Sequence, residues 1–288
     1  MRAHALALAV VLVIGVCAAC GDVQTEAPPK TIQHYVALGD TFAAAPYTSH
    51  TVPASGCRRA RHNYPSQVAD ALGVASFTDV SCTGADVRAA TRRMKARRHR
   101  LEPQVSAVQK STDLVTVQFG AYADDLYDKI ADACAPDSPY ACRLSLAAGG
   151  MQAIIQKVRQ SLGAAIRSIG DRAPAAHVVV VGYPRHVDGK ETCKALPKMV
   201  AVDRRAWAQV DEALQLALSR AARDTGSSFV DVYAASKHHG ICSAHPWVRS
   251  VITDRHRGIA LGPTAAGEKA ISELIHTTLA SDPTLDVG

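Results

Sequence analysis

Three positions that could carry chemistry lie just beyond apolar segments of this chain. They are Thr41 after Tyr35–Leu38, Gly84 after Phe77–Ser81, and Tyr122 after Leu114–Phe119. A hydroxyl such as that of Thr41 becomes a nucleophile only when a base takes its proton. Donors must also stabilise the oxyanion that its attack produces. We therefore looked for a base and for donors that the fold would bring to the same place.

Several histidines and carboxylates are candidates for the missing base. His256 lies in Asp254-Arg255-His256-Arg257, where Asp254 could orient the imidazole. The alternative for His256 is an exposed loop histidine, and the same alternative applies to three others: His238, His239 and His245. Asp124 and Asp125 could offer a carboxylate, although negative charge at a helix N-terminus explains them better. Asp40 is expected to support the turn before Thr41.

The order of the motifs resembles that of the GDSL or SGNH hydrolases, and in particular their exported, disulfide-bearing actinobacterial branch. The resemblance extends from about Tyr35 to Leu279. It rests on six blocks in order: Gly39-Asp40-Thr41, Asp79–Ala85, Val115–Gly120, Val181–Pro184, Cys242–Trp247 and Gly262–Gly267. No single block is specific, because a Gly-Asp-Thr tripeptide also occurs by chance. The full order, together with the cysteines, is specific.

The resemblance implies a role for each block and exposes several departures. Thr41 stands at the nucleophile position, and Gly84 stands where the family offers a backbone N–H to the oxyanion. Tyr122 replaces the family's asparagine donor, and Gly262 replaces its catalytic histidine. Ile259 stands where many members have an aspartate. Only Gly84 is retained among the four residues that name the family. The chemistry of this family needs no cofactor or metal, and we expect none.

Two hypotheses about function follow from these departures. The first is a catalytically silent binding or scaffold protein that keeps the cleft for a lipid, an acyl ester or an envelope glycan. The second is an active esterase or lipase that uses Thr41 with a displaced base such as His256. Losing the nucleophile or the base of a serine hydrolase costs on the order of 10⁶ in turnover. This favours the silent protein.

Hydrophobic patterns place these positions on an alternating α/β framework. Apolar runs predict strands at residues 35–38, 77–81, 114–119, 177–181 and 228–232, and helical spacing predicts helices at 63–72, 151–169, 200–223 and 264–279. Continuous apolar strands separated by helices indicate a parallel sheet that is covered on both faces. The family resemblance makes this a three-layer α/β/α sandwich with a five-stranded parallel sheet of flavodoxin-like type. Two cysteine-bearing stretches, 127–150 and 186–197, are expected to be loops.

The cysteines indicate disulfide bonds in an exported protein. Six remain beyond the N-terminal segment: Cys57, Cys82, Cys134, Cys142, Cys193 and Cys242. Their even number favours disulfides, and the lack of a CxxC pair disfavours a zinc site. Six cysteines allow fifteen pairings, among which spacing cannot choose. The family pairs them in chain order, which implies Cys57–Cys82, Cys134–Cys142 and Cys193–Cys242.

The N-terminus is typical of an export signal followed by a lipid anchor. Residues 1–19 combine basic residues, an apolar stretch and small residues before Cys20, as in a secretion signal. We expect Cys20 to be lipidated. The alternatives are lipidation of Cys17 and an ordinary cleaved signal that leaves Cys20 free. Residues 20–33 would form the anchor and tether, 34–282 the hydrolase-like domain, and 283–288 a tail. The protein would then be attached to the outer face of the cell membrane.

Charge limits the possible partners. The net charge is +6, and much of the positive excess lies between Arg88 and Arg100. This basic stretch could be a solvated face, or a surface that meets anionic lipid headgroups or an acidic envelope polymer. Nucleic acid is not expected as a partner, because the basic residues lack interleaved aromatic side chains. We expect the protein to be a monomer.

Overall fold

A parallel sheet forms the centre of the protein. The computed structural model describes residues 28–52, 56–134, 150–188 and 192–287. The sheet has five strands, which in chain order are β2 (His34–Gly39), β3 (Ser76–Asp79), β6 (Leu114–Gln118), β7 (His177–Val181) and β8 (Ser228–Val230). Their spatial order is β3-β2-β6-β7-β8, and all four pairings are parallel. This is the flavodoxin-like order, so the predicted fold class is confirmed.

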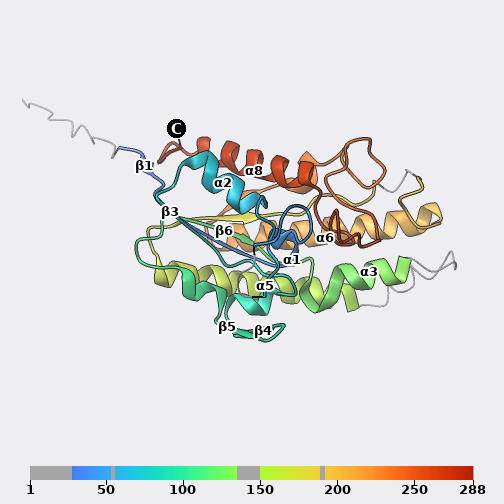
Figure 1. Ribbon diagram of the computed structural model, residues 1–288, viewed down its shortest axis with the longest axis horizontal. Helices are drawn as coiled ribbons and strands as arrows, with labels where there is room; N and C mark the ends of the chain where they lie inside the picture. Colours follow the sequence, from blue (N-terminus) through green and yellow to red (C-terminus); the bar gives the residue numbers. More distant parts are fainter. Residues whose placement is uncertain (1–27, 53–55, 135–149, 189–191, 288) are drawn as a thin grey trace, which may run out of the picture.

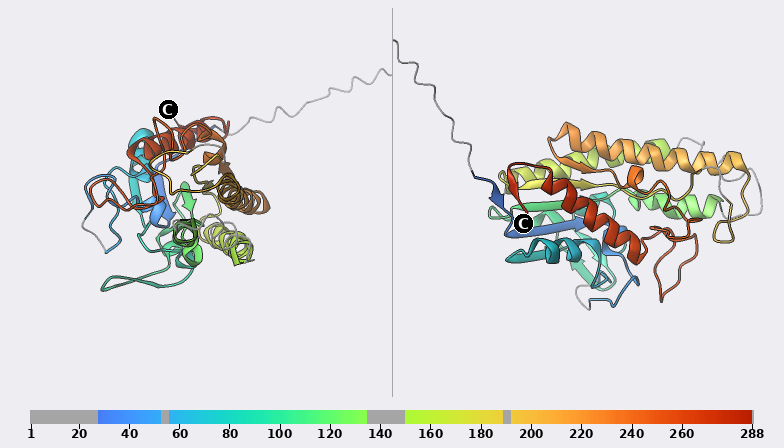
Figure 2. Two further views of the ribbon diagram at one scale, coloured as in Figure 1. Left: turned by 90° about the vertical axis from the view of Figure 1, so that its right-hand side faces the viewer. Right: turned by 90° about the horizontal axis from the view of Figure 1, so that it is seen from above.

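Helices cover both faces of the sheet. They are α2 (Tyr64–Leu72), α5 (Gly150–Arg172), α6 (Ala201–Asp224) and α8 (Ala265–Ala280). Helices α2 and α8 lie together on one face and α5 and α6 on the other (Figures 1 and 2). The sheet is buried between these layers, and every residue of β6 is buried. Among the described residues, no helix is both long and apolar enough to cross a membrane.

Short elements connect this framework. They are α1 (Thr41–Ala44), η1 (Val87–Ala90), η2 (Gln104–Ala107), η3 (Ala123–Asp125), α3 (Leu126–Cys134) and α7 (Val232–Ala235). The sequence pattern missed α3, whose residues we expected to be loop. Leu126, Tyr127 and Ile130 are buried there at helical spacing. The segment is too short for a strong periodic signal, and the rest of the predicted loop, residues 135–149, lies outside the described residues.

The structure differs from the predicted boundaries at β8. We predicted a strand to residue 232, whereas β8 ends at Val230. Asp231 causes the change, because its carboxylate accepts a hydrogen bond of 2.8 Å from the backbone N–H of Ala234 and so begins α7. An aspartate at this position acts as a helix N-cap.

Secondary structure also extends beyond the predicted domain limits of 34 and 282. Strand β1 (Lys30–Thr31) pairs in parallel with β9 (Leu285–Asp286). Lys30 Nζ lies 2.8 Å from the carboxylate of Asp113. The two ends of the described chain therefore lie side by side at one end of the sheet (Figure 1).

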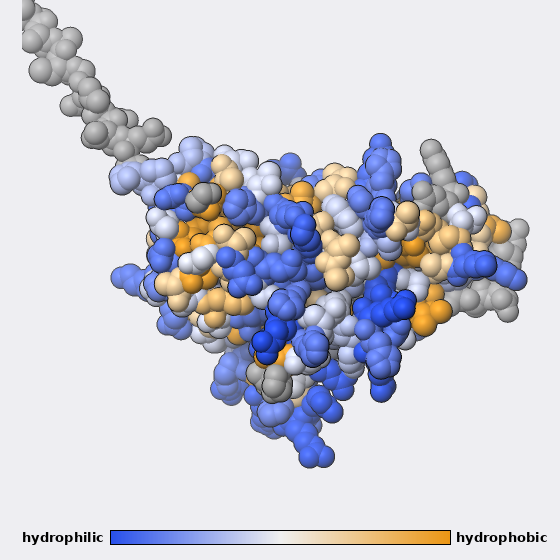
Figure 3. Space-filling model, turned by 45° about the horizontal axis from the view of Figure 1, so that its top comes forward, coloured by the Kyte–Doolittle hydropathy of each residue, from blue (hydrophilic) through white to orange (hydrophobic). Residues whose placement is uncertain are grey.

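A small antiparallel hairpin projects from the body of the molecule. It consists of β4 (Met94–Ala96) and β5 (His99–Leu101), and it carries much of the basic stretch. It lies on the side away from α2 and α8 (Figure 1), and the corresponding protrusion in Figure 3 is strongly hydrophilic. We had not predicted this hairpin.

Disulfides fasten two of the loops. They join Cys57 to Cys82 and Cys193 to Cys242, the pairings implied by the family resemblance. For the third implied pair, Cys142 lies outside the described residues.

Candidate active site

The site is built on the turn that follows β2. Asp40 caps the short helix α1, because its Oδ1 accepts a hydrogen bond of 2.9 Å from the backbone N–H of Phe42. Its Oδ2 accepts hydrogen bonds from Tyr183 Oη at 2.6 Å and from the N–H of Gly120 at 3.2 Å. Asp40 therefore joins the ends of β2, β6 and β7, in the supporting role expected from the sequence.

Asp40 is completely buried, and this determines its ionisation. Burial raises the pKa of Asp40 to about 7, despite hydrogen bonds from Tyr183 and from the backbone that favour the carboxylate. The aromatic ring of Tyr183 packs edge-on against Phe42, with the ring centres 5.3 Å apart. Asp40 thus titrates near neutral pH within a rigid support, although no solvent reaches it.

Thr41 lies directly beside the retained glycine. Its Oγ1 accepts a hydrogen bond of 2.8 Å from the backbone N–H of Gly84. Thr41 as a whole is only 5% exposed. In the resemblance, the Gly84 N–H would face the oxyanion, whereas here it is bonded to the threonine hydroxyl. A substrate carbonyl oxygen would have to displace this bond to use the donor.

Tyr122 lies at the same edge of the sheet. The residue as a whole is partly exposed, but its hydroxyl oxygen is buried and has no hydrogen-bond partner among the described residues. Burial and the nearby charge of Asp40 raise the pKa of Tyr122 well above its usual value, so the phenol stays protonated. This position therefore offers a buried O–H donor where the family resemblance implied an amide.

At the histidine position, an isoleucine fills the space beside the backbone. A Cβ atom on Gly262 would lie 2.5 Å from Ile259 Cγ1 and 3.2 Å from the carbonyl oxygen of Ile259. The segment is held by a hydrogen bond of 2.8 Å from the N–H of Arg249 to the oxygen of Gly262. The two departures from the family pattern, Ile259 and Gly262, therefore pack against each other. Any larger side chain at residue 262 would have to displace Ile259.

His256 lies on a tight turn before this segment. Its side chain is exposed, and its backbone N–H donates a hydrogen bond of 2.9 Å to Asp254 Oδ1. Asp254 thus caps the turn and lies 3.8 Å from Arg257, instead of orienting the imidazole. Within the described parts of the chain, no histidine forms a hydrogen bond with Thr41.

The other loop histidines and the acidic pair are either exposed or bonded to local partners. His239 stacks on Trp247 with ring centres 4.4 Å apart, and its Nδ1 lies 2.8 Å from the oxygen of His245. His238 and His245 are exposed. Asp124 lies 3.6 Å from both Arg88 and Lys157. These groups therefore act in turns and surface ion pairs in this structure.

The sequence reading missed a buried histidine–aspartate pair. His186 is 0% exposed, and its Nδ1 lies 3.1 Å from Asp211 Oδ1. On its other side, Nε2 lies 3.4 Å from the carbonyl oxygen of Leu261, the neighbour of Gly262. The signal in the sequence was Asp211 itself, a carboxylate on the buried stripe of α6. The pair supports the loop behind the site and is sealed from solvent.

A cleft of about 540 Å³ opens over Gly84 and Tyr122. Its described lining is mostly charged or small, and it includes Asp86, Arg88, Asp124, Asp125, Lys129 and Lys157. Ile154 is the largest aliphatic side chain in this lining. Such a lining suits a polar ligand better than a long acyl chain, because apolar ligands need mainly apolar walls.

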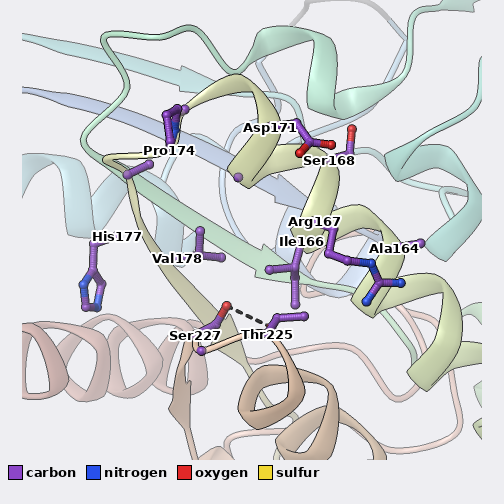
Figure 4. A pocket seen from close by; sticks show the side chains of 14 residues that line it. Ala164, Ile166, Arg167, Ser168, Asp171, Pro174, His177, Val178, Thr225 and Ser227 are labelled. Carbon is purple, nitrogen blue, oxygen red and sulfur yellow. Dashed lines mark hydrogen bonds between the residues drawn. The ribbon is translucent and has the colours of Figure 1, made fainter.

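A second cavity, of about 760 Å³, lies at the opposite end of the sheet (Figure 4). It is bordered by His177 at the start of β7 and by Thr225 and Ser227, whose hydroxyl oxygens are 3.1 Å apart. This cavity is separate from the Thr41 turn. In the described parts of the chain, no cluster of histidine, cysteine and acidic residues could hold a metal ion.

Comparison with known proteins gives one consistent result. Residues 37–270 match the model of the GDSL-like Lipase/Acylhydrolase family. Lipase 1 of Streptomyces coelicolor is 30% identical over 246 residues, which cover 84% of this chain and 85% of that protein. A lipase of Streptomyces rimosus is 29% identical over 250 residues, with coverage of 84% and 85%.

Solved structures agree with the sequence comparisons. The crystal structure of phospholipase A1 from Streptomyces albidoflavus superposes with a TM-score of 0.74 at 27% identity, covering 86% of this chain and 99% of the other. The extracellular lipase of S. rimosus gives a TM-score of 0.73 at 26% identity, with coverage of 85% and 99%.

Proposed function

Because the chain belongs to the GDSL-like lipase/acylhydrolase family, we propose that it keeps the family's ester-hydrolase fold as a catalytically silent binding or scaffold protein of the cell envelope. The observation that carries this proposal is the hydrogen bond from the Gly84 N–H to Thr41 Oγ1, formed where no described histidine reaches the hydroxyl. Without a base the hydroxyl stays protonated and is a weak nucleophile.

Threonine itself adds to this effect. Its branched Cβ restricts χ1 and crowds the approach to a carbonyl carbon. The residue is also buried, with only 5% of its surface exposed. Both properties oppose attack on an ester even if a base could reach the site.

We propose that the ligand of the cleft is polar, such as an envelope glycan, because charged groups dominate its described lining. Tyr122 also lines this cleft, beside the charged groups. Thermal-shift measurements with chitohexaose and with laurate compare the two ligand classes. Stabilisation by chitohexaose supports this choice, whereas stabilisation by laurate alone contradicts it.

An active esterase is the alternative, and the intact Gly84 N–H favours it. Hydrolysis of p-nitrophenyl acetate and butyrate, by the wild type and Thr41→Ala, separates the two functions. We expect equal, negligible rates for both proteins. Turnover well above buffer that disappears in Thr41→Ala would establish the esterase and refute the silent protein.

We further propose that the protein is exported and anchored through a lipidated Cys20. The support is the order of basic, apolar and small residues before that cysteine. Two acyl chains would give stable attachment to the membrane. Metabolic labelling with a fatty-acid analogue should mark the wild type and Cys17→Ser, but not Cys20→Ser. The opposite pattern would assign the anchor to Cys17.

A further inference from the structure

A basic pocket lies between the projecting hairpin and the loop before α2, in a part of the protein that the cleft does not use. It has a volume of about 480 Å³, and its lining consists of Thr51, Val52, Gly56, Arg58, Arg97, Arg98 and His99. Three arginines and one histidine thus surround one hollow, and the lining contains no acidic residue.

Its arginines are not neutralised by neighbours. In the described residues, no carboxylate lies within 4.0 Å of the guanidinium groups of Arg58, Arg97 or Arg98, while the nearby Arg93 pairs with Glu102 at 3.0 Å. Arg58 is partly buried and held in place, because its Nη1 donates to Tyr47 Oη at 2.8 Å. The adjacent Cys57 is fixed by its disulfide to Cys82.

Two arginines of the pocket have backbone conformations that arginine rarely adopts. Arg97 and Arg98 form the two-residue turn between β4 and β5, and Arg97 has a φ of +55°. Such turns normally place glycine, asparagine or aspartate where φ is positive. Arg58 also has a positive φ, of +49°. Strained residues of this kind often mark functional positions.

One glycine allows the pocket to close at its base. A Cβ atom on Gly56 would lie 2.9 Å from the carbonyl oxygen of Ala96 and 3.1 Å from His99 Cδ2. The loop at residue 56 therefore presses directly on the hairpin, and this contact brings Arg58 close to the turn residues.

We propose that this pocket binds the phosphate group of an anionic phospholipid and that the hairpin is the face that rests on the membrane surface. Guanidinium groups match phosphate oxygens in geometry as well as charge. The surrounding exposed side chains of Arg92, Lys95 and Arg100 extend the positive surface beyond the pocket, which suits an extended anionic surface. The projection of the hairpin from the body gives it access to such a surface (Figures 1 and 3).

The test is a vesicle-binding assay with the full chain. Binding is measured to vesicles of equimolar phosphatidylglycerol and phosphatidylcholine, relative to pure phosphatidylcholine, which accounts for any contribution of the apolar N-terminal segment. We expect R97Q/R98Q to lower this ratio by about 30-fold. This value follows because each arginine near an anionic surface contributes about 1 kcal/mol to binding.

The matched control removes the same charge elsewhere. Arg205 and Arg220 are exposed on α6, away from the hairpin, so R205Q/R220Q should leave the ratio nearly unchanged. An equal loss in both variants would show a general effect of net charge and overturn the proposal. A wild type that prefers soluble polyphosphate and ignores the anionic vesicles would also overturn it. The assay does not depend on hydrolysis or on the cleft, so its outcome is separate from that of the proposed function.

Discussion

The two sides of the candidate active site differ in what they retain of a hydrolase. On the nucleophile side, Asp40 joins three strand ends, and Thr41 meets the N–H of Gly84 at 2.8 Å. On the base side, Gly262 is packed against Ile259 and the nearby His256 points from an exposed turn. The first side also holds the sheet together, whereas the second lies in the loop before α8. Under the proposal of a silent protein, this difference means that the parts of a catalytic site that also support the fold are kept, while those serving only proton transfer are lost.

Rebuilding the base side should have the largest effect. We expect Thr41→Ser alone to leave ester hydrolysis near the buffer rate, since no histidine of the described residues forms a hydrogen bond with residue 41. The combined variant adds Gly262→His as the base and Ile259→Asp as its partner. The second change also removes the isoleucine that packs against residue 262. The combined variant should hydrolyse p-nitrophenyl butyrate about 10³-fold faster than Thr41→Ser, and not faster still, because Tyr122 would still replace the family's asparagine donor.

The control for this rebuilding is Gly262→His without the change at Ile259. Its new Cβ would meet Ile259 Cγ1 at 2.5 Å, so we expect a loss of about 1–3 kcal/mol in the free energy of unfolding from overpacking. Strong activity of Thr41→Ser by itself would show that a base is already in place.

Removing the support on each side should have unequal effects on stability. Asp40→Ala deletes a buried carboxylate that accepts three hydrogen bonds, and we expect it to cost about 3 kcal/mol. Asp254→Ala removes a cap from an exposed turn and should cost about 1 kcal/mol or less. Urea unfolding of both variants measures these losses in the free energy of unfolding. Equal losses would contradict the expected difference between the two sides.

The nucleophile side should also make stability depend on pH. The pKa of Asp40 rises from 3.8 to about 7 on folding, so the folded protein holds this proton more tightly than the unfolded chain. The resulting stabilisation is complete below about pH 4 and is lost as the pH rises through about 7. We expect the wild type to lose stability relative to Asp40→Asn as the pH rises between these values, by on the order of 1 kcal/mol per pH unit. Urea unfolding of both proteins measures this difference in the free energy of unfolding. A constant difference would contradict the raised pKa.

Two tyrosines give the smallest expected contrast. Tyr183 Oη donates to Asp40, so Tyr183→Phe should lower the free energy of unfolding by about 1–2 kcal/mol. Tyr122 Oη has no partner among the described residues, and Tyr122→Phe should be neutral or stabilising by up to about 1 kcal/mol. Thermal unfolding of the two variants checks the order. A larger loss for Tyr122→Phe would reveal a partner for its hydroxyl.

The sequence predicted the framework and the edge at which Thr41, Gly84 and Tyr122 gather, because buried parallel strands leave long apolar runs such as Val178–Val181. It did not predict the β4–β5 hairpin. Arg97 and Arg98 occupy its turn where glycine or asparagine would have marked it, and its strands have only three residues each.

The sequence also did not predict the pairing of His186 with Asp211. The two residues are 25 positions apart and meet only when α6 packs beside the loop after β7. The filling of the space at Gly262 by Ile259 depends likewise on loop geometry. Local patterns carry little information on such contacts, since tertiary packing creates them.

Reaction of the wild type with a fluorophosphonate probe, followed by intact-mass analysis and peptide mapping, tests the central claim most directly. If the base has been lost while the nucleophile turn is kept, Thr41 should remain unlabelled after prolonged incubation. Stoichiometric labelling of Thr41 would show an activated hydroxyl and contradict the account.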